Sequence, residues 1–182
     1  MSYQEIVFAG FGGQGILSMG KFLAYAGMDA GQNVSWLPSY GPEMRGGTAN
    51  CSVIITGEAI GSPVVTNPTS LVVMNRPSLD RFEGALRPGG LLMIDTNLVT
   101  RPATRTDISV IGVPAQTLAE EIGSKKAANM ILLGALVEKT GVVSVDALIT
   151  AVRLHGKGQF FELNKMAIET GAKLAHQTTV AE

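Results

Sequence analysis

Cysteine is nearly absent from this chain of 182 residues, since Cys51 is the only one. A single thiol cannot form a disulfide within the chain, and it cannot hold an iron–sulfur cluster by itself. Cys51 lies in an apolar, strand-like segment, which indicates a buried and inert thiol; a reactive nucleophile is the alternative. We therefore expect no redox chemistry from this chain on its own.

Charged residues are also scarce, at 16% of the sequence, against about a quarter in an average soluble domain. The 14 Lys and Arg residues nearly balance the 15 Asp and Glu residues, so the formal net charge is −1. That balance lacks the basic excess typical of proteins that bind nucleic acid or an anionic membrane. Apolar surface buried against a partner explains the low charge best, and a single tightly packed core is the alternative.

Catalytic patterns and targeting signals are missing too. The two histidines, His155 and His176, have no nucleophile beside them, and the sequence shows no zinc spacing, carboxylate pair or P-loop. We assign no catalytic residue and no metal site. No apolar run approaches the roughly 20 residues of a membrane span, and the first residues lack the basic start of a signal peptide. We expect a cytoplasmic protein that binds neither membrane nor nucleic acid.

The length fits one domain over residues 1–182. Apolar and β-branched runs predict strands at residues 4–9, 33–37, 49–56, 59–65, 71–74, 91–95 and 107–113. Helical periodicity predicts helices at residues 14–30 and 77–86 and three or four more after residue 115. This alternation predicts an α/β fold, namely a three-layer α/β/α domain with a mostly parallel, mixed central sheet. We expect Pro38 to end the second strand, and residues 49–56 and 59–65 to form a hairpin.

The most informative segment follows the first strand, where Gly10-Phe-Gly-Gly-Gln-Gly15 precedes a helix. Its spacing is that of a phosphate-binding βα turn, in which the backbone bends sharply and offers N–H groups to an anion. A classical NAD site also needs an acidic residue at the end of the second strand, and Ser35-Trp-Leu-Pro38 has none there. A phosphate or pyrophosphate of another cofactor, or a turn that needs glycine for geometry alone, remain as interpretations.

A second glycine-rich segment, Pro38-Ser-Tyr-Gly-Pro-Glu-Met-Arg-Gly-Gly47, follows the second strand. Arg45 could hold a carboxylate or phosphate in bidentate fashion, with Glu43 orienting it. The alternative is an exposed ion pair on an ordinary loop. Trp36 and Tyr40 offer flat apolar faces to a ligand or a partner, although such residues more often belong to the core.

Both glycine-rich segments, together with Asn129-Met-Ile-Leu-Leu-Gly-Ala135, resemble the γ subunit of 2-oxoacid:acceptor (ferredoxin) oxidoreductases. The resemblance extends through Leu91-Leu-Met-Ile-Asp95 and reaches Asn164, so it covers nearly the whole chain. It implies a complex that oxidatively decarboxylates a 2-oxoacid with coenzyme A (CoA), yields an acyl-CoA and passes electrons to ferredoxin.

The resemblance also implies partners. Thiamine diphosphate, Mg and iron–sulfur clusters would be held by the α and β subunits, and in some complexes by δ, while this chain binds none of them alone. Among the oxoacids of the family, 2-oxoglutarate is the expected substrate by analogy, with pyruvate and branched-chain oxoacids as alternatives. We expect the isolated chain to lack turnover and to self-associate through the surface meant for its partners.

Our hypothesis is that the two glycine-rich segments face the active site of the complex and help receive the phosphates of CoA or close over the substrate. The competing functions are a stand-alone nucleotide-binding reductase and a non-catalytic scaffold module of the same fold. The candidate ligand-binding residues are Gly10, Gly12, Gly13, Gln14, Gly15, Glu43, Arg45, Gly46 and Gly47.

Overall fold

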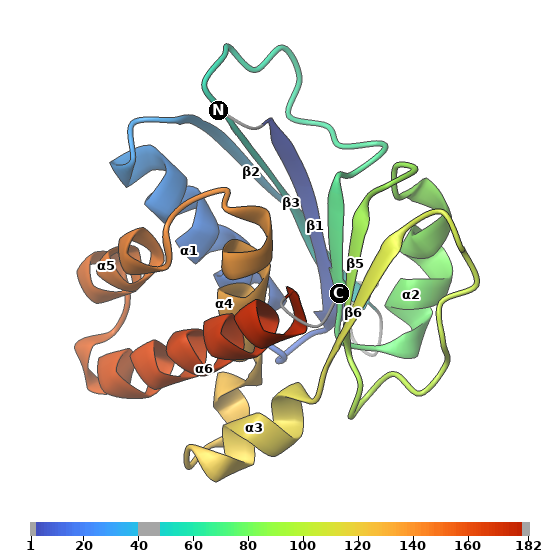
Figure 1. Ribbon diagram of the computed structural model, residues 1–182. Coiled ribbons are helices and arrows are strands. Elements are labelled where there is room, and N and C mark those ends of the chain that lie inside the picture. Colours follow the sequence, from blue (N-terminus) through green and yellow to red (C-terminus); the bar gives the residue numbers. More distant parts are fainter. Residues whose placement is uncertain (1–2, 40–47, 180–182) are drawn as a thin grey trace.

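The computed structural model, which describes residues 3–39 and 48–179, contains one six-stranded sheet in the order β2-β3-β1-β4-β5-β6 (Figure 1). Strands β1, β4, β5 and β6 pair in parallel, and β3 runs antiparallel to both of its neighbours, β1 and β2. The predicted α/β fold with a mostly parallel, mixed sheet is confirmed. The strands are β1 (Gln4–Phe11), β2 (Asn33–Ser39), β3 (Thr48–Thr56), β4 (Ser70–Val73), β5 (Leu91–Asp95) and β6 (Ser109–Val113).

Helices lie on both faces of the sheet, with most of them on one side (Figure 1). Helix α2 lies on the opposite face from α1, α4, α5 and α6, which gives the three layers. The helices are α1 (Ile16–Asp29), α2 (Arg76–Phe82), α3 (Ala115–Glu121), α4 (Ala128–Thr140), α5 (Val145–His155) and α6 (Phe161–Thr179). Short 3-10 turns are η2 (Glu83–Ala85), η3 (Lys125–Ala127) and η4 (Gly158–Phe160).

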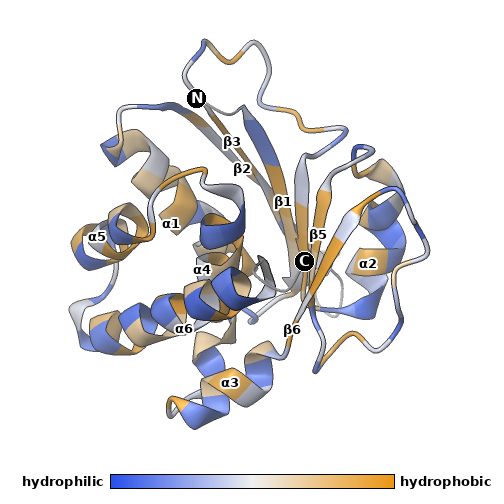
Figure 2. Cartoon of the chain, viewed as in Figure 1, coloured by the Kyte–Doolittle hydropathy of each residue, from blue (hydrophilic) through white to orange (hydrophobic). Residues whose placement is uncertain are grey.

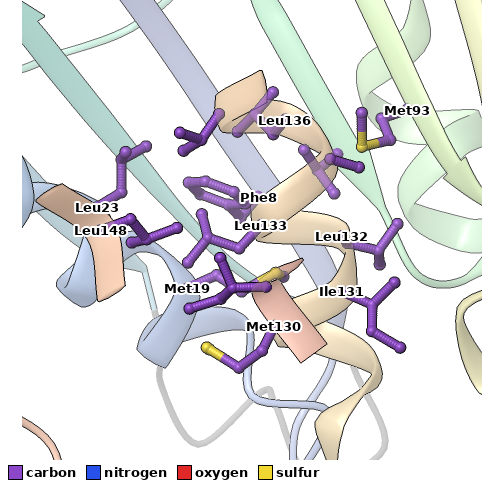
Figure 3. Close-up of a cluster of buried hydrophobic side chains, with 14 of the residues drawn as sticks. Phe8, Met19, Leu23, Met93, Met130, Ile131, Leu132, Leu133, Leu136 and Leu148 are labelled. Carbon is purple, nitrogen blue, oxygen red and sulfur yellow. The ribbon is translucent and has the colours of Figure 1, made fainter. Parts of the chain in front are cut away.

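The alternation of side chains along β1 divides the core into two clusters. Ile6 and Phe8 are fully buried on the side of the larger helical layer, whereas Val7 packs in a smaller cluster with residues of β4 and β5. Helix α4 lies at the centre of the larger cluster, and every residue from Ala128 to Val137 is buried (Figure 3). Figure 2 shows the complementary pattern on α6, whose residues alternate between hydrophobic and hydrophilic.

Helices α4 and α6 cross closely, and glycine makes this possible. A Cβ atom on Gly134 would overlap the backbone carbonyl of Ile168, and one on Gly171 would overlap the carbonyl of Ile131. Two backbones can approach to this distance only where side chains are missing. The close packing of α6 on α4 therefore depends on these two glycines.

On the other face, Glu83 holds the long loop that connects β5 to β6. Its carboxylate accepts hydrogen bonds from the Arg101 guanidinium at 2.9 Å and from the backbone N–H groups of Thr104 at 2.5 Å and Arg105 at 3.1 Å. Burial alone would raise the pKa of Glu83, but these hydrogen bonds outweigh it and lower the pKa. The ionised carboxylate thus stabilises the loop.

The predicted hairpin between residues 49–56 and 59–65 is wrong. Strand β3 pairs with β2 and β1 instead, and both of its edges are thereby occupied. In residues 57–69, polar side chains satisfy part of the backbone: Glu58 donates its N–H to Thr56 Oγ1 at 3.1 Å, and Val64 donates to Ser62 Oγ at 3.2 Å.

The second strand also extends further than predicted. Pro38 lies within β2, which ends at Ser39. This is possible because β2 is an edge strand, where a missing N–H group costs no ladder hydrogen bond on the open side.

In residues 3–39 and 48–179, no helix combines the length and the apolar character needed to cross a lipid bilayer.

Candidate functional site

The glycine turn, defined here as Gly12–Gly15, links the carboxyl end of β1 to the start of α1. Gly13 and Gly15 have φ angles of +90° and +76°, a left-handed conformation that side chains other than glycine rarely adopt. Gly15 directly precedes α1, and the first turn of α1 carries no acidic residue. The free N–H groups and positive dipole end of α1 are therefore available to an anion.

Gln14 fixes this turn to two strands. Its Oε1 accepts a hydrogen bond from the Phe11 N–H at 2.6 Å, and its Nε2 donates to the Met74 carbonyl at 3.1 Å, just beyond β4. The side chain of Gln14 thus has a structural role in holding the turn. Gly10 lies within β1 rather than in the turn, and a Cβ there would stand 2.5 Å from Gln14 Oε1 and 2.7 Å from Ile16 Cδ1.

Asn129, in the first turn of α4, holds the end of the glycine turn at Gly15. Its Nδ2 donates to the Gly15 carbonyl at 3.2 Å, and its Oδ1 accepts from the Met130 N–H at 2.9 Å. A Cβ on Gly15 would overlap the Asn129 amide, whereas a Cβ on Gly12 or Gly13 would meet no atom of the described residues within 4 Å. Gly10 and Gly15 are therefore packed against the protein, and no described side chain hinders the approach of a ligand to Gly12 and Gly13.

Polar groups lie at the same edge, because the carboxyl ends of β1, β4 and β5 point the same way. Asn75 follows β4, and its Oδ1 accepts from the Ser78 N–H at 2.8 Å. Both residues are buried, and the Asn75 Nδ2 and Ser78 Oγ atoms have no hydrogen-bond partner among the residues described. At the end of β5, burial raises the pKa of Asp95, and hydrogen bonds from Gln116 and from backbone N–H groups offset part of that rise.

Strand β2 ends at Ser39 and contains no acidic residue that could bind a ribose. Asp29, at the end of α1, instead places its Oδ2 3.2 Å from His155 Nε2. The His155 ring stacks on Tyr25 with a centroid distance of 3.9 Å. His155 ends α5, and its ring packs on Tyr25 and pairs with Asp29.

Cys51 is fully buried, and burial raises the pKa of its thiol to about 12. The predicted burial of this thiol is confirmed, and its inertness stays a prediction. In the described part of the chain, no three His, Cys, Asp or Glu residues gather into a possible metal site.

The structure thus brings Gly12, Gly13, Gln14 and Gly15 together at the end of β1 and places Gly10 just before them. The predicted residues Glu43, Arg45, Gly46 and Gly47, with Tyr40, lie outside the described residues. Sequence reasoning missed the roles of Asn129 and Asn75. Asn129 opens the third segment of the family resemblance, which was its one signal.

Comparison with known proteins tests the family resemblance. Residues 5–174 match the family described as pyruvate ferredoxin/flavodoxin oxidoreductase. The crystal structure of the γ subunit of keto/oxoacid ferredoxin oxidoreductase from Geobacter sulfurreducens is 32% identical, with a TM-score of 0.85 over 96% of this chain and 99% of that one.

Two curated relatives come from Methanothermobacter marburgensis. The ketoisovalerate oxidoreductase subunit VorA is 41% identical over 98% of this chain, and this chain spans only 38% of its length. The 2-oxoglutarate synthase subunit KorC is 38% identical over 94% of this chain and 96% of its own length. The resemblance is confirmed, and the chain belongs to the pyruvate ferredoxin/flavodoxin oxidoreductase family.

Proposed function

We propose that this chain is the γ subunit of a 2-oxoacid:ferredoxin oxidoreductase and that its glycine turn receives the phosphates of CoA. The observation that carries the proposal is the open face of Gly12 and Gly13 in a turn that Gln14 and Asn129 hold in place. Such a turn allows a phosphate to approach backbone N–H groups without side-chain interference.

The chemistry of the complex would come from its partners. Thiamine diphosphate and iron–sulfur clusters on the α and β subunits, or on δ, would supply decarboxylation and electron transfer to ferredoxin. A chain with one cysteine, which is buried, cannot hold such a cluster itself. This chain's part is to bind and orient CoA, with Arg45 as a second, charged contact to its phosphates.

A further part of the proposal is which 2-oxoacid the complex oxidises. The similarity to KorC along nearly the whole of both chains supports 2-oxoglutarate, and the similarity to VorA supports ketoisovalerate. We propose 2-oxoglutarate as the first substrate to test, with ketoisovalerate and pyruvate beside it.

The first experiment is an anaerobic pull-down of the tagged chain from its native host. We expect larger subunits to co-purify with iron and thiamine diphosphate, and the complex to reduce a dye only with an oxoacid and CoA. A chain recovered alone, without either cofactor, would contradict the subunit assignment.

The second experiment tests the turn itself. Gly12→Ala adds a methyl group with no atom of the described residues within 4 Å, so folding should tolerate it, and so should the matched control Gly84→Ala in η2. In the assembled complex we expect Gly12→Ala to raise the apparent KM for CoA about tenfold, as for a weakened charge-assisted hydrogen bond, and Gly84→Ala to leave it unchanged. An unchanged KM for Gly12→Ala would make the turn a docking element.

A further inference from the structure

A pocket of about 370 Å³ lies between helices of the larger helical layer. Its walls come from α1, η3, the start of α4, the link between α5 and η4, and α6. The volume lies within the range of about 300–1,000 Å³ that is usual for small-ligand sites. We call it the lysine pocket, after Lys21, Lys126 and Lys157, which line it.

The charged residues that line this pocket are basic. No acidic residue lines it, and among the residues described none of the three lysines forms an ion pair. Neighbouring lysines differ in this respect, because Lys125 pairs with Glu120 at 2.6 Å and Lys165 with Glu169 at 3.9 Å. The three lysines are exposed and line one cavity from separate segments, so a bound anion would be attracted to all of them.

The rest of the lining is apolar and aromatic. The Phe22 ring is half-buried and packs against Gly156, where an added Cβ would lie 3.4 Å from its Cζ. Phe160, in η4, is 46% exposed at the other side of the pocket. Asn164 adds an amide from α6. Aromatic rings beside cations suit a ligand that has both a flat ring and an anionic group.

His155 also lines the pocket but does not add to its free polar groups, because it is stacked on Tyr25 and paired with Asp29. The three lysines are therefore the remaining cationic groups of the pocket, and Lys21 Nζ lies 5.8 Å from the centroid of the Tyr25 ring.

The pocket shares a wall with the glycine turn. Asn129 lines the pocket and also donates its hydrogen bond to the Gly15 carbonyl. Ser18, in the first turn of α1, lines the pocket as well. A ligand in the pocket would thus lie beside the start of α1, next to the turn but on its far side from β4.

We propose that the lysine pocket binds a nucleoside phosphate, with the phosphates at Lys21, Lys126 and Lys157 and the base against Phe22 and Phe160. The nucleotide is one that is free in solution, because the proposed function already assigns the phosphates of CoA to the glycine turn. The pocket is distinct from the glycine turn, so each can fail without the other.

The test is calorimetric titration of the full chain with four probes: ADP, CoA, adenosine and inorganic pyrophosphate. We expect ADP to bind at least tenfold more tightly than either adenosine or pyrophosphate, because it carries both base and phosphates. Binding of CoA that Lys157→Gln weakens as much as it weakens binding of ADP would place the nucleotide end of CoA in the pocket and overturn the assignment to a free nucleotide. An absence of ADP binding, or binding of pyrophosphate as tight as that of ADP, would overturn the proposal.

Substitutions of the pocket lysines test where the nucleotide binds. Lys126→Gln and Lys157→Gln should each weaken nucleotide binding about tenfold, which corresponds to the loss of one charge-assisted hydrogen bond. Lys173→Gln is the matched control, because Lys173 is exposed on α6 and does not line the pocket. Equal affinities for all three variants would refute the assignment.

The base contact has its own pair of variants. Phe160→Ala should weaken ADP binding and leave pyrophosphate unaffected, and Leu154→Ala, at a residue 65% exposed outside the pocket, should change neither. Gly12→Ala should not alter ADP binding in this assay. A loss with Gly12→Ala and not with Lys157→Gln would place the nucleotide at the glycine turn instead.

Discussion

Replacement of Gly15 by alanine tests the geometry of the glycine turn most directly. Gly15→Ala combines two separate costs, because the residue has a φ of +76° and because its Cβ would overlap the Asn129 amide. Gly13→Ala carries only the first cost, since its φ is +90° and nothing lies within 4 Å. Gly12→Ala carries neither.

The left-handed conformation costs a residue with a side chain about 1–3 kcal/mol. Overpacking against a fixed neighbour adds typically about 1–3 kcal/mol more. We therefore expect destabilisation of about 4 kcal/mol for Gly15→Ala, about 2 kcal/mol for Gly13→Ala, and less than about 0.5 kcal/mol for Gly12→Ala.

A double-mutant cycle separates the two costs. In an Asn129→Ala background the overlap is removed, so Gly15→Ala should cost only its conformational strain, about as much as Gly13→Ala does. Urea unfolding of the full chain, followed by circular dichroism, gives the four free energies. A cost of Gly15→Ala that is the same in both backgrounds would refute the contact between α4 and the turn, since only coupled residues deviate from additivity.

Three further outcomes follow from the fold. Gly171→Ala should destabilise the chain by about 2 kcal/mol or more, because its Cβ would overlap the Ile131 carbonyl; an unchanged urea midpoint would contradict the close helix crossing. Glu83→Gln should cost about 2 kcal/mol near neutral pH, because the Arg101 guanidinium loses its charged acceptor. Since folding lowers the pKa of Glu83, this stabilisation is present above about pH 4.3 and is lost as the pH falls through the lowered value, so wild type and variant should converge in acid unfolding; a constant difference would contradict the assignment. Cys51 should resist alkylation in native buffer at pH 8 and react once the chain is unfolded in urea, because burial raises its pKa to about 12; labelling of the native protein would show that the thiol is accessible.

The sheet was largely predictable because each strand is marked by its own apolar run. Strand pairing was not, because it depends on residues far apart in the chain. Strand β3 was expected to pair with the segment that follows it, but it pairs with β2 and β1. A β-branched run identifies a strand without indicating which neighbour occupies each edge.

The candidate site was also predictable only where it depends on local sequence. The glycine spacing from Gly10 to Gly15 is local, and it correctly predicted a tight turn between β1 and α1. The hydrogen bond from Asn129 to Gly15 joins residues 114 positions apart, so no local sequence pattern predicts it. The lysine pocket is assembled from Lys21, Lys126 and Lys157 on three separate segments. Such a cluster arises only from tertiary packing and leaves no spacing to recognise.

Glycine spacing alone also cannot say which glycines serve a ligand. Gly10 is required because Gln14 and Ile16 occupy the space of its missing side chain, and Gly15 because Asn129 does. These outer positions of the pattern would be glycine even in a turn that binds nothing. Among the residues described, no atom lies within 4 Å of a Cβ added at Gly12 or Gly13, and the φ of Gly12 is not positive. Under the proposed function, Gly12 is glycine so that a phosphate can approach, and a substitution there should test binding without disturbing the fold.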